Sequence, residues 1–214
     1  MTYHDITVVI TSFRSETKII DCLNSIKPEV KVIIIENSNN SDFKKRVEKR
    51  YSNVICFLSN ENLGYAKGNN FGLKKVKSKY ALIINPDAVL ENDAIDNFLL
   101  SAKNNQDFAL LGPYIQESNH FKAQNNSEQE LKEVDSIKGF AMFFNMSQFK
   151  DIGFFDENIF IYLEEIDLCR RVKIFKKKII LDPSIKVKHA VGTSQDKKIK
   201  YEMEHAIKLL WMLS

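Results

Sequence analysis

The first hundred residues contain four short apolar runs, and each is followed by a segment with helical spacing. The runs cover residues 6–10, 30–35, 54–58 and 80–84, and they are rich in valine and isoleucine. Short, continuous apolar runs of this kind are typical of strands that a sheet buries on both faces. Strands that alternate with helices need crossover connections, which make neighbouring strands parallel. We therefore expect an α/β fold with a mostly parallel central sheet flanked by helices.

The pattern changes after about residue 112. Residues 116–133 are crowded with Asn, Gln, Glu and Ser, which indicates a loop. About a hundred residues on each side is little for two domains, so we expect one domain over residues 1–214 with two functional halves, 1–112 and 113–214. The other expected elements are helices at 16–26, 41–51, 69–77 and 92–104, a strand at 140–144, a short helix near 146–150, an acidic helix from about Leu163, and strands near Ile179 and Val187.

Composition excludes several classes of protein. The 214 residues include 31 basic and 28 acidic side chains, a balance that does not favour nucleic acid as a partner. Three cysteines without metal-type spacing favour free buried thiols in a reducing cytoplasm. No segment approaches the roughly 20 apolar residues of a transmembrane helix, and residues 1–10 lack the basic start of a signal peptide. We therefore expect a cytoplasmic protein.

Polar residues follow each of the four predicted strands, and two glycines, Gly64 and Gly68, follow the third. The carboxyl ends of parallel strands meet at one edge of a sheet, where α/β proteins bind ligands. Glu36 can accept from the N–H of a pyrimidine, Gly64 lets the backbone approach a ribose or phosphate, and Lys67 can pair with a phosphate. Each residue taken alone is better explained as part of an ordinary loop, but their repetition at one edge favours a nucleotide site. The candidates are Thr11, Ser12, Glu36, Asn62, Gly64, Lys67, Asn85 and Asp87.

Asp87 belongs to the segment Asn85-Pro86-Asp87, which ends the fourth apolar run. Pro86 has no N–H to donate to a central ladder, so the strand ends near Asn85 and Asp87 lies on the loop beyond it. A single carboxylate is a poor cation site, whereas Mg²⁺ or Mn²⁺ binds through one or two carboxylates together with phosphates and water. His189 follows an alternating strand and is the candidate second ligand, although a core histidine is the more frequent explanation.

Three acids, Glu164, Glu165 and Asp167, fall within four residues at the expected start of a helix. Acids in a first turn complement the helix dipole, and Asp167 with Arg171 forms an i,i+4 pair, so a structural role is open for each of them. Glu164 and Glu165 point about 100 degrees apart on a helix. One of them can therefore face a cleft, where a carboxylate accepts a proton from a sugar hydroxyl.

Taken in order, these segments resemble the family 2 glycosyltransferases, and within them the rhamnosyltransferase-like branch. The match covers most of the chain, and its strength lies in the order of the segments. Two positions depart from the family pattern, since Glu36 and Glu165 stand where the family usually has aspartate. The matching segments are ITVVITSFRSE, VIIIENSNNSD, NENLGYAKGNNFGL, LIINPDA, KGFAMFF, IGFFDENIFIYLEEIDLCRR and VKHAVGTS.

The resemblance implies a GT-A fold and an inverting transfer of a sugar from a nucleotide diphosphate sugar to an acceptor hydroxyl. It implies a nucleotide-sugar-binding half at 1–112 and an acceptor and catalytic half at 113–214. It also implies a divalent metal, Mg²⁺ or Mn²⁺, on Asp87 with help from His189, and a catalytic base at Glu165, with Glu164 and Asp167 as its alternatives. The implied donor contacts are Thr11, Ser12, Glu36, Asn62, Gly64, Lys67, Asn85 and Asp87, and the segment that begins at Lys138 and Gly139 is similar to the one lining the sugar and acceptor site.

Several alternatives stay open. A nucleotide-sugar-binding module with weak or lost catalysis fits the change from aspartate to glutamate at Glu165. A nicotinamide dehydrogenase is disfavoured because no G-x-G-x-x-G follows the first strand. The donor is expected to be dTDP-rhamnose or a UDP-sugar, and the acceptor a surface glycan or a lipid-linked glycan. Peripheral contact with the inner membrane face through the C-terminal cluster 207–213 and a homo-oligomer are also left open.

Overall fold

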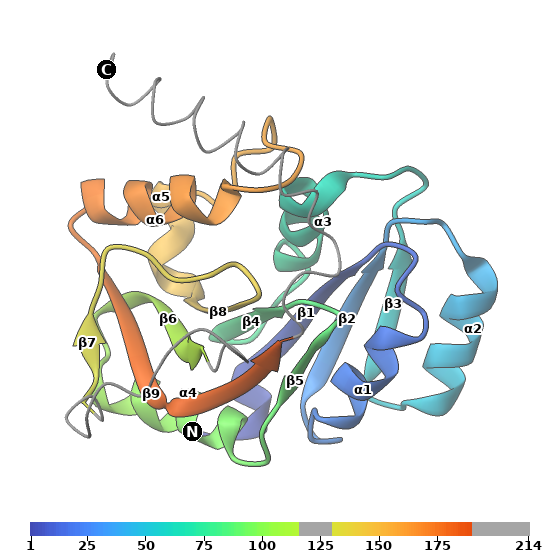
Figure 1. Ribbon diagram of the computed structural model, residues 1–214, viewed down its shortest axis with the longest axis horizontal. Coiled ribbons are helices and arrows are strands. Elements are labelled where there is room, and N and C mark those ends of the chain that lie inside the picture. Colours follow the sequence, from blue (N-terminus) through green and yellow to red (C-terminus); the bar gives the residue numbers. More distant parts are fainter. Residues whose placement is uncertain (116–129, 190–214) are drawn as a thin grey trace.

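The computed structural model describes residues 1–115 and 130–189. Within these ranges the strands are β1 (Ile6–Ser12), β2 (Lys31–Glu36), β3 (Val54–Leu58), β4 (Tyr80–Ile84), β5 (Ala88–Leu90), β6 (Phe108–Ile115), β7 (Lys132–Glu133), β8 (Ala141–Asn145) and β9 (Lys178–His189). They form one sheet in the order β3-β2-β1-β4-β8-β6-β9-β5, and β7 pairs with β9 (Figure 1). The α/β class expected from the sequence is confirmed.

The sheet is parallel in its first part and mixed in its second. β1 pairs in parallel with β2 and β4, and β2 pairs in parallel with β3. β8 then runs antiparallel to both β4 and β6, while β6 and β9 are parallel. The expected parallel arrangement therefore holds for β3-β2-β1-β4, and beyond β4 the one parallel pair among the described strands is β6 with β9. This change of direction brings the end of β9 back beside β5, which runs antiparallel to it.

Helices cover both faces of the sheet. Figure 1 shows α3, α5 and α6 above the strands and α4 below them. The first core layer packs α1, α2 and α4 against one face, and the second packs α3, α5 and α6 against the other. The helices are α1 (Lys18–Asn24), α2 (Ser41–Arg50), α3 (Gly64–Leu73), α4 (Ala94–Asn104), α5 (Phe149–Ile152) and α6 (Glu164–Ile174), with short 3-10 turns η1 (Tyr3–Asp5) and η2 (Met146–Gln148).

Each central strand divides its side chains between the two core layers. On β4, Leu82 and Ile84 belong to the first layer, whereas Ala81 and Ile83 belong to the second. Successive side chains of a strand point to opposite faces, so a strand buried on both faces is apolar throughout. This explains why β1, β2 and β4 are almost continuous apolar runs in the sequence, whereas the edge strand β3 leaves Ile55 exposed.

Five elements differ from the sequence-based expectation, namely α3, β5, β6, β7 and β9. Helix α3 begins at Gly64, five residues before the expected 69–77, so Gly64 and Gly68 also lie within the helix. The two strands expected near Ile179 and Val187 are one strand, β9, which contains Pro183. Strands β5 and β6 were not expected, and the polar stretch 116–133 ends in the short strand β7. The C-terminal cluster 207–213 and the segment after His189 lie outside the described residues.

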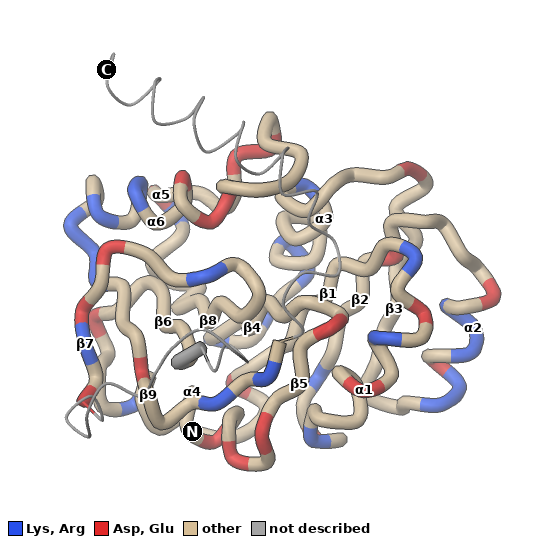
Figure 2. The backbone as a smooth tube through the Cα atoms, viewed as in Figure 1, with Lys and Arg blue, Asp and Glu red and all other residues tan. Residues whose placement is uncertain are grey.

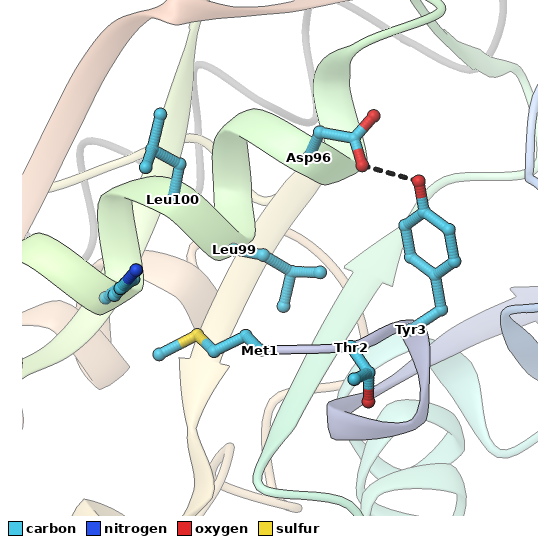
Figure 3. Close-up of a pocket in the computed structure, with 7 residues that line it drawn as sticks. Met1, Thr2, Tyr3, Asp96, Leu99 and Leu100 are labelled. Atoms are coloured by element: carbon cyan, nitrogen blue, oxygen red, sulfur yellow. Dashed lines mark hydrogen bonds between the residues drawn. The ribbon is translucent and has the colours of Figure 1, made fainter.

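At the amino edge of the parallel strands, η1 packs against α4. The Tyr3 hydroxyl donates to Asp96 over 2.6 Å, and the Lys27 ammonium lies 2.5 Å from each of them. A hollow of about 500 Å³ beside this cluster is lined by residues of η1 and α4, including Leu99 and Leu100 (Figure 3). In the described part of the chain, none of the helices has the length and apolar character needed to span a bilayer.

Candidate active site

The ends of β1 and β2 place three buried polar side chains next to one another. Ser12 and Glu36 are partners in the parallel register, and the N–H of Asn37 donates to the Ser12 carbonyl over 2.7 Å. One carboxylate oxygen of Glu36 accepts from the N–H of Ser38 over 2.9 Å and from its hydroxyl. The second Glu36 oxygen, the Ser12 hydroxyl and the Asn37 amide oxygen are buried without a partner. These atoms are available to a ligand.

The first turn of α3 packs closely against these strand ends. Gly64 has a φ of +72°, and a Cβ atom there would lie 2.4 Å from the carbonyl oxygen of Phe160. A Cβ atom at Gly68 would lie 2.6 Å from the methyl group of Thr11. The Thr11 hydroxyl donates to Asn69 over 2.9 Å. Position 64 therefore requires glycine for two reasons, namely its left-handed backbone conformation and the close approach of the Phe160 carbonyl.

Asn62 and Lys67 flank this turn at the surface. The Asn62 side chain is exposed, and its oxygen accepts from the Gly64 N–H over 3.1 Å. Lys67 is also exposed, and it is close enough to Glu157 to interact with it electrostatically. Of these two predicted donor contacts, Asn62 therefore has a clear structural role in holding the start of α3.

The register of β5 with β9 brings Asp87 and His189 together. β4 ends at Ile84, and the N–H of Ala88 closes a turn onto the Asn85 carbonyl over 3.1 Å. Ala88 is then the register partner of His189. The imidazole Nε2 lies 3.2 Å from Asp87 Oδ1 and 3.4 Å from the Asn85 amide nitrogen. A carboxylate and an imidazole that were 102 positions apart in the sequence therefore meet, as the sequence predicted.

The segment Gly139-Phe140 lies beside this pair. The Asn85 N–H donates to the Phe140 carbonyl over 2.8 Å, and the Phe140 ring stacks on His189 with centroids 4.8 Å apart. On its other side, the backbone of Gly139 faces Glu165, because a Cβ atom at Gly139 would lie 3.6 Å from Glu165 Cβ. Lys138 is exposed at the start of this segment.

Helix α6 presents two carboxylates of different character. Glu164 is buried and one of its oxygens has no partner, whereas Glu165 is half-buried. Burial, and then the negative charge of Glu165, raises the pKa of Glu164 to about 8. Burial, followed by the charges of Glu164 and Glu165 and more weakly that of Asp87, raises the pKa of Tyr65. Glu164, Glu165 and Asp87 therefore all lie close enough to the Tyr65 hydroxyl to affect its pKa. Figure 2 shows the acidic start of α6 facing α3.

The third acid of this helix has a structural partner. The Asp167 carboxylate accepts from Arg171 over 2.9 Å, and the same guanidinium donates to the carbonyls of Ile152 and Phe154 over 2.9 and 2.5 Å. This arrangement ties α6 to the end of α5. The i,i+4 pair that the sequence suggested is present, and it gives Asp167 a function without catalysis.

The chain enters α6 through two consecutive residues in the left-handed conformation. Tyr162 and Leu163 have φ values of 68° and 71°. The Leu163 carbonyl accepts from the N–H groups of Ile166 and Asp167 over 3.1 Å each, which starts the helix. Left-handed conformations cost about 1–3 kcal/mol each for residues other than glycine, and such strain is concentrated at functional sites.

Partnerless buried atoms are concentrated around these residues. Among the described residues, six buried side-chain oxygens have no hydrogen-bond partner, and five of them lie at the ends of β1, β2 and β4 or at the start of α6. Native proteins satisfy most buried polar atoms, so each exception calls for a cause. A polar ligand in this region would supply the missing partners. The five atoms are Ser12 Oγ, Glu36 Oε2, Asn37 Oδ1, Asn85 Oδ1 and Glu164 Oε2.

The donor set beside β5 fits a divalent cation that also binds phosphate. The described residues contain no group of three or more His, Cys, Asp or Glu side chains arranged to hold a metal alone. The Asp87 carboxylate and the His189 imidazole nevertheless meet, and the Asn85 amide beside the imidazole has an oxygen without a partner. Mg²⁺ and Mn²⁺ accept such oxygen ligands and complete their shells with phosphates and water.

The structure brings together most of the predicted site residues. Thr11, Ser12 and Glu36 meet at the ends of β1 and β2, whereas Asn62 and Lys67 remain at the rim. Sequence reasoning did not single out Asn37, although it directly follows Glu36. Nor did it single out Tyr65, whose only sequence signal is its place between two glycines of the α3 motif.

Comparisons with known proteins agree with this geometry. The family model described as Glycosyl transferase family 2 matches residues 7–180. The low-salt glycan biosynthesis hexosyltransferase Agl10 of Haloferax volcanii is 24% identical over 192 residues, which cover 79% of this chain and 62% of that protein. The dTDP-rhamnosyl transferase RfbF of Shigella flexneri is 25% identical over 222 residues, which cover 92% and 71%.

A similarity to solved structures supports the fold. The mannosyltransferase PcManGT from Pyrobaculum calidifontis, in complex with GDP-Man and Mn²⁺, has a TM-score of 0.74 and 12% sequence identity over 89% of this chain and 58% of that one. At this identity the likeness concerns the fold alone. The chain spans less than two thirds of the length of both Agl10 and PcManGT.

Proposed function

Because the chain belongs to glycosyl transferase family 2, we propose that it is an inverting glycosyltransferase. It moves a sugar from a nucleotide diphosphate sugar to an acceptor hydroxyl in the synthesis of a surface glycan. The observation that carries the proposal is the group of partnerless buried oxygens at the ends of β1, β2 and β4 and on Glu164. In this proposal these oxygens contact the bound donor along its length, from the nucleobase to the sugar.

The nucleotide lies at the ends of β1 and β2. Its base meets the second Glu36 oxygen and the Asn37 amide oxygen, both of which accept hydrogen bonds, while the Ser12 hydroxyl can donate or accept. Buried acceptors that gain a donor on binding convert a desolvation cost into binding energy. Gly64 and Gly68 allow the start of α3 to pack close to its neighbours, and the backbone of this helix then forms one side of the ribose site.

The diphosphate lies beside Asp87, Asn85 and His189. Asp87 and His189 would hold a divalent cation, which supplies charge neutralisation to the departing diphosphate when bound. The Phe140 ring fixes the orientation of the His189 imidazole by stacking on it. These residues therefore organise the leaving-group side of the reaction.

Glu165 is the general base. The acceptor oxygen bonds to the anomeric carbon from the face opposite the diphosphate, the carbon–oxygen bond to the diphosphate breaks, and the proton of the acceptor hydroxyl goes to Glu165. Glu164 holds a proton at neutral pH because its pKa is raised to about 8 by burial and by Glu165. The two neighbouring carboxyls thus differ in charge, so one can accept a proton while the other donates a hydrogen bond.

The donor and the acceptor are proposed at the level of class. Similarity to RfbF, a dTDP-rhamnosyl transferase, supports a dTDP-linked deoxysugar, with a UDP-sugar as the alternative. Similarity to Agl10, a glycan biosynthesis hexosyltransferase, supports a glycan or lipid-linked glycan acceptor. Both substrates are expected at the cytoplasmic side.

Calorimetric titration with dTDP, UDP, GDP and a dinucleotide, each with and without Mn²⁺, tests the donor site. We expect one pyrimidine diphosphate to bind in a Mn²⁺-dependent manner. Asp87→Asn keeps the size of the side chain and should abolish the Mn²⁺ dependence. The matched control is Asp107→Asn just before β6, whose exposed side chain pairs with Lys178 at the amino edge of the sheet, and it should bind as the wild type does.

Absence of binding by every nucleotide would overturn the proposal. Binding without transfer would favour the alternative, a nucleotide-sugar-binding module that has lost catalysis. In that case Glu165→Asp restores the shorter side chain that the family usually carries. A gain of transfer by this variant would assign the loss to residue 165.

A further inference from the structure

We propose that Tyr65 is a positioning residue that sets the spacing between the base at Glu165 and the leaving-group side at Asn85 and His189. The inference rests on the proposed function, because it concerns the arrangement of those groups. Tyr65 lies in the first turn of α3 and belongs to none of the strand ends that form the donor site. Its importance follows from the number of segments that it joins.

Tyr65 connects three parts of the chain. Its N–H donates to the carbonyl of Phe160, in the loop before α6, over 2.7 Å. Its hydroxyl donates to the carbonyl of Gly139 over 2.6 Å. Its ring packs edge-on against Phe155, with centroids 6.1 Å apart. A single residue therefore joins the start of α3 to the loop that leads into α6, through its backbone N–H and its ring, and to the Gly139-Phe140 segment, through its hydroxyl.

The Gly139-Phe140 segment separates the two chemical sides of the site. On one side Gly139 faces Glu165, with 3.6 Å between its ideal Cβ position and Glu165 Cβ. On the other side Phe140 accepts from the Asn85 N–H over 2.8 Å and stacks on His189. A displacement of this segment therefore changes the distance between the base and the diphosphate groups.

The hydroxyl of Tyr65 is suited to hold this segment. Gly139 has no side chain to anchor it, and glycine has the largest conformational freedom of any residue. Burial, followed by the charges of Glu164 and Glu165, raises the pKa of Tyr65, so the phenol stays protonated and remains a donor. A short hydrogen bond from a rigid ring to the Gly139 carbonyl restricts the movement of the segment.

Tyr65→Phe tests the inference because it removes the hydroxyl and keeps the ring contact with Phe155. We expect kcat to fall roughly tenfold to a hundredfold, the range expected for small misplacements of catalytic groups. The donor KM and the affinity for the nucleoside diphosphate should change less than about twofold, because no donor contact is lost. The acid limb of the pH dependence of kcat, which reports the base, should shift.

The matched control is Tyr3→Phe. Tyr3 also donates a hydrogen bond over 2.6 Å, but to Asp96 at the opposite edge of the sheet (Figure 3). We expect its kcat to equal that of the wild type. An unchanged kcat in Tyr65→Phe would overturn the inference, as would an equal fall in both variants. A loss of nucleotide affinity as large as the fall in kcat would also overturn it, since Tyr65 would then act on donor binding.

A measurement without turnover separates this inference from the proposed function. Hydrogen exchange of the Asn85 amide, which donates to Phe140, should be faster in Tyr65→Phe than in the wild type and unchanged in Tyr3→Phe. Equal exchange rates in Tyr65→Phe and the wild type would overturn the positioning role even if the protein transfers sugar. If the wild type binds no nucleotide, the proposed function fails, and faster exchange would still support the contact that we infer.

Discussion

The two edges of the parallel strands differ in how far their polar groups are hydrogen-bonded within the protein. At the amino edge, Tyr3, Lys27 and Asp96 bond to one another, and Thr7 pairs with Ser78 over 2.8 Å. At the carboxyl edge, buried oxygens at the ends of β1, β2 and β4 have no partner among the described residues. Both edges belong to the same strands, so the apolar composition of the strands does not explain why only one edge has partnerless polar atoms.

The free-energy cost of the partnerless oxygens at the carboxyl edge indicates that this edge binds a ligand. A buried polar atom without a partner costs about 1–3 kcal/mol, whereas a satisfied hydrogen bond stabilises by about 1 kcal/mol. The hydrogen-bonded polar groups at the amino edge therefore contribute to folding, and the partnerless oxygens at the carboxyl edge oppose it. A ligand that supplies hydrogen bonds at the carboxyl edge recovers this cost, which makes that edge the place for binding.

The largest expected effect belongs to the base. Glu165→Gln keeps the size of the side chain and removes its ability to accept a proton, so the transfer rate should fall by about 10²–10⁴-fold. Nucleotide affinity should stay close to the wild-type value, because the donor contacts lie at the strand ends. Steady-state transfer assays and calorimetric titration measure the two quantities.

Asp167→Asn is the control for Glu165→Gln on the same helix. It weakens the ion pair with Arg171 and leaves Glu165 in place. We therefore expect a lower melting temperature and a transfer rate close to that of the wild type. Normal turnover by Glu165→Gln together with a large loss in Asp167→Asn would move the base to Asp167 and contradict the assignment.

A smaller effect concerns stability and pH at Glu164. Burial and the charge of Glu165 raise the pKa of Glu164 from its ordinary value of 4.5 to about 8. Between these pH values the unfolded chain has released a proton that the folded protein keeps. The free energy of unfolding therefore falls as pH rises through this window, by up to roughly 1.4 kcal/mol per pH unit, and levels off above it.

Glu164→Gln should remove this dependence, because glutamine does not titrate. Its stability relative to the wild type should increase as pH rises from 5 to 8, as measured by urea unfolding at several pH values in this range. Glu29→Gln, at an exposed turn, is the control and should follow the wild type at each pH. Parallel curves for Glu164→Gln and the wild type would show that Glu164 is ionised in the folded protein at neutral pH.

Much of this arrangement could be predicted from the sequence, for physical reasons. Strand β4 occupies the predicted residues 80–84, because a strand buried on both faces must be apolar throughout and Pro86 stops its ladder. The meeting of Ser12 with Glu36 follows from parallel register, which places strand ends at one edge. The sequence therefore predicted which strand ends lie together at this edge.

Other features depend on contacts between distant segments. The bond between Tyr65 and Gly139 joins residues 74 positions apart, and no local pattern encodes it. The two strands expected near Ile179 and Val187 are one strand, because β9 passes through Pro183 with a register shift. Asp182 accepts from the N–H and hydroxyl of Ser184 there, so the proline lies at an irregularity where its missing N–H is tolerated.

The smallest expected effects sharpen the comparison between the two edges. Ser12→Ala and Tyr3→Phe each remove one hydroxyl, at the carboxyl and the amino edge respectively. Ser12→Ala should leave the free energy of unfolding unchanged or raise it by up to about 1 kcal/mol, because a partnerless buried group is removed. Its nucleotide affinity should fall about fivefold, the value of one hydrogen bond.

Tyr3→Phe should do the reverse, lowering the free energy of unfolding by about 1 kcal/mol through loss of its bond to Asp96. Its nucleotide affinity should equal that of the wild type. Because the Asp96–Lys27 pair is at the surface, the remaining stabilisation of this cluster should decrease with added salt. If Ser12→Ala destabilised the protein while Tyr3→Phe weakened nucleotide binding, the division between a folding edge and a binding edge would be wrong, since each hydroxyl would then serve the function assigned to the other.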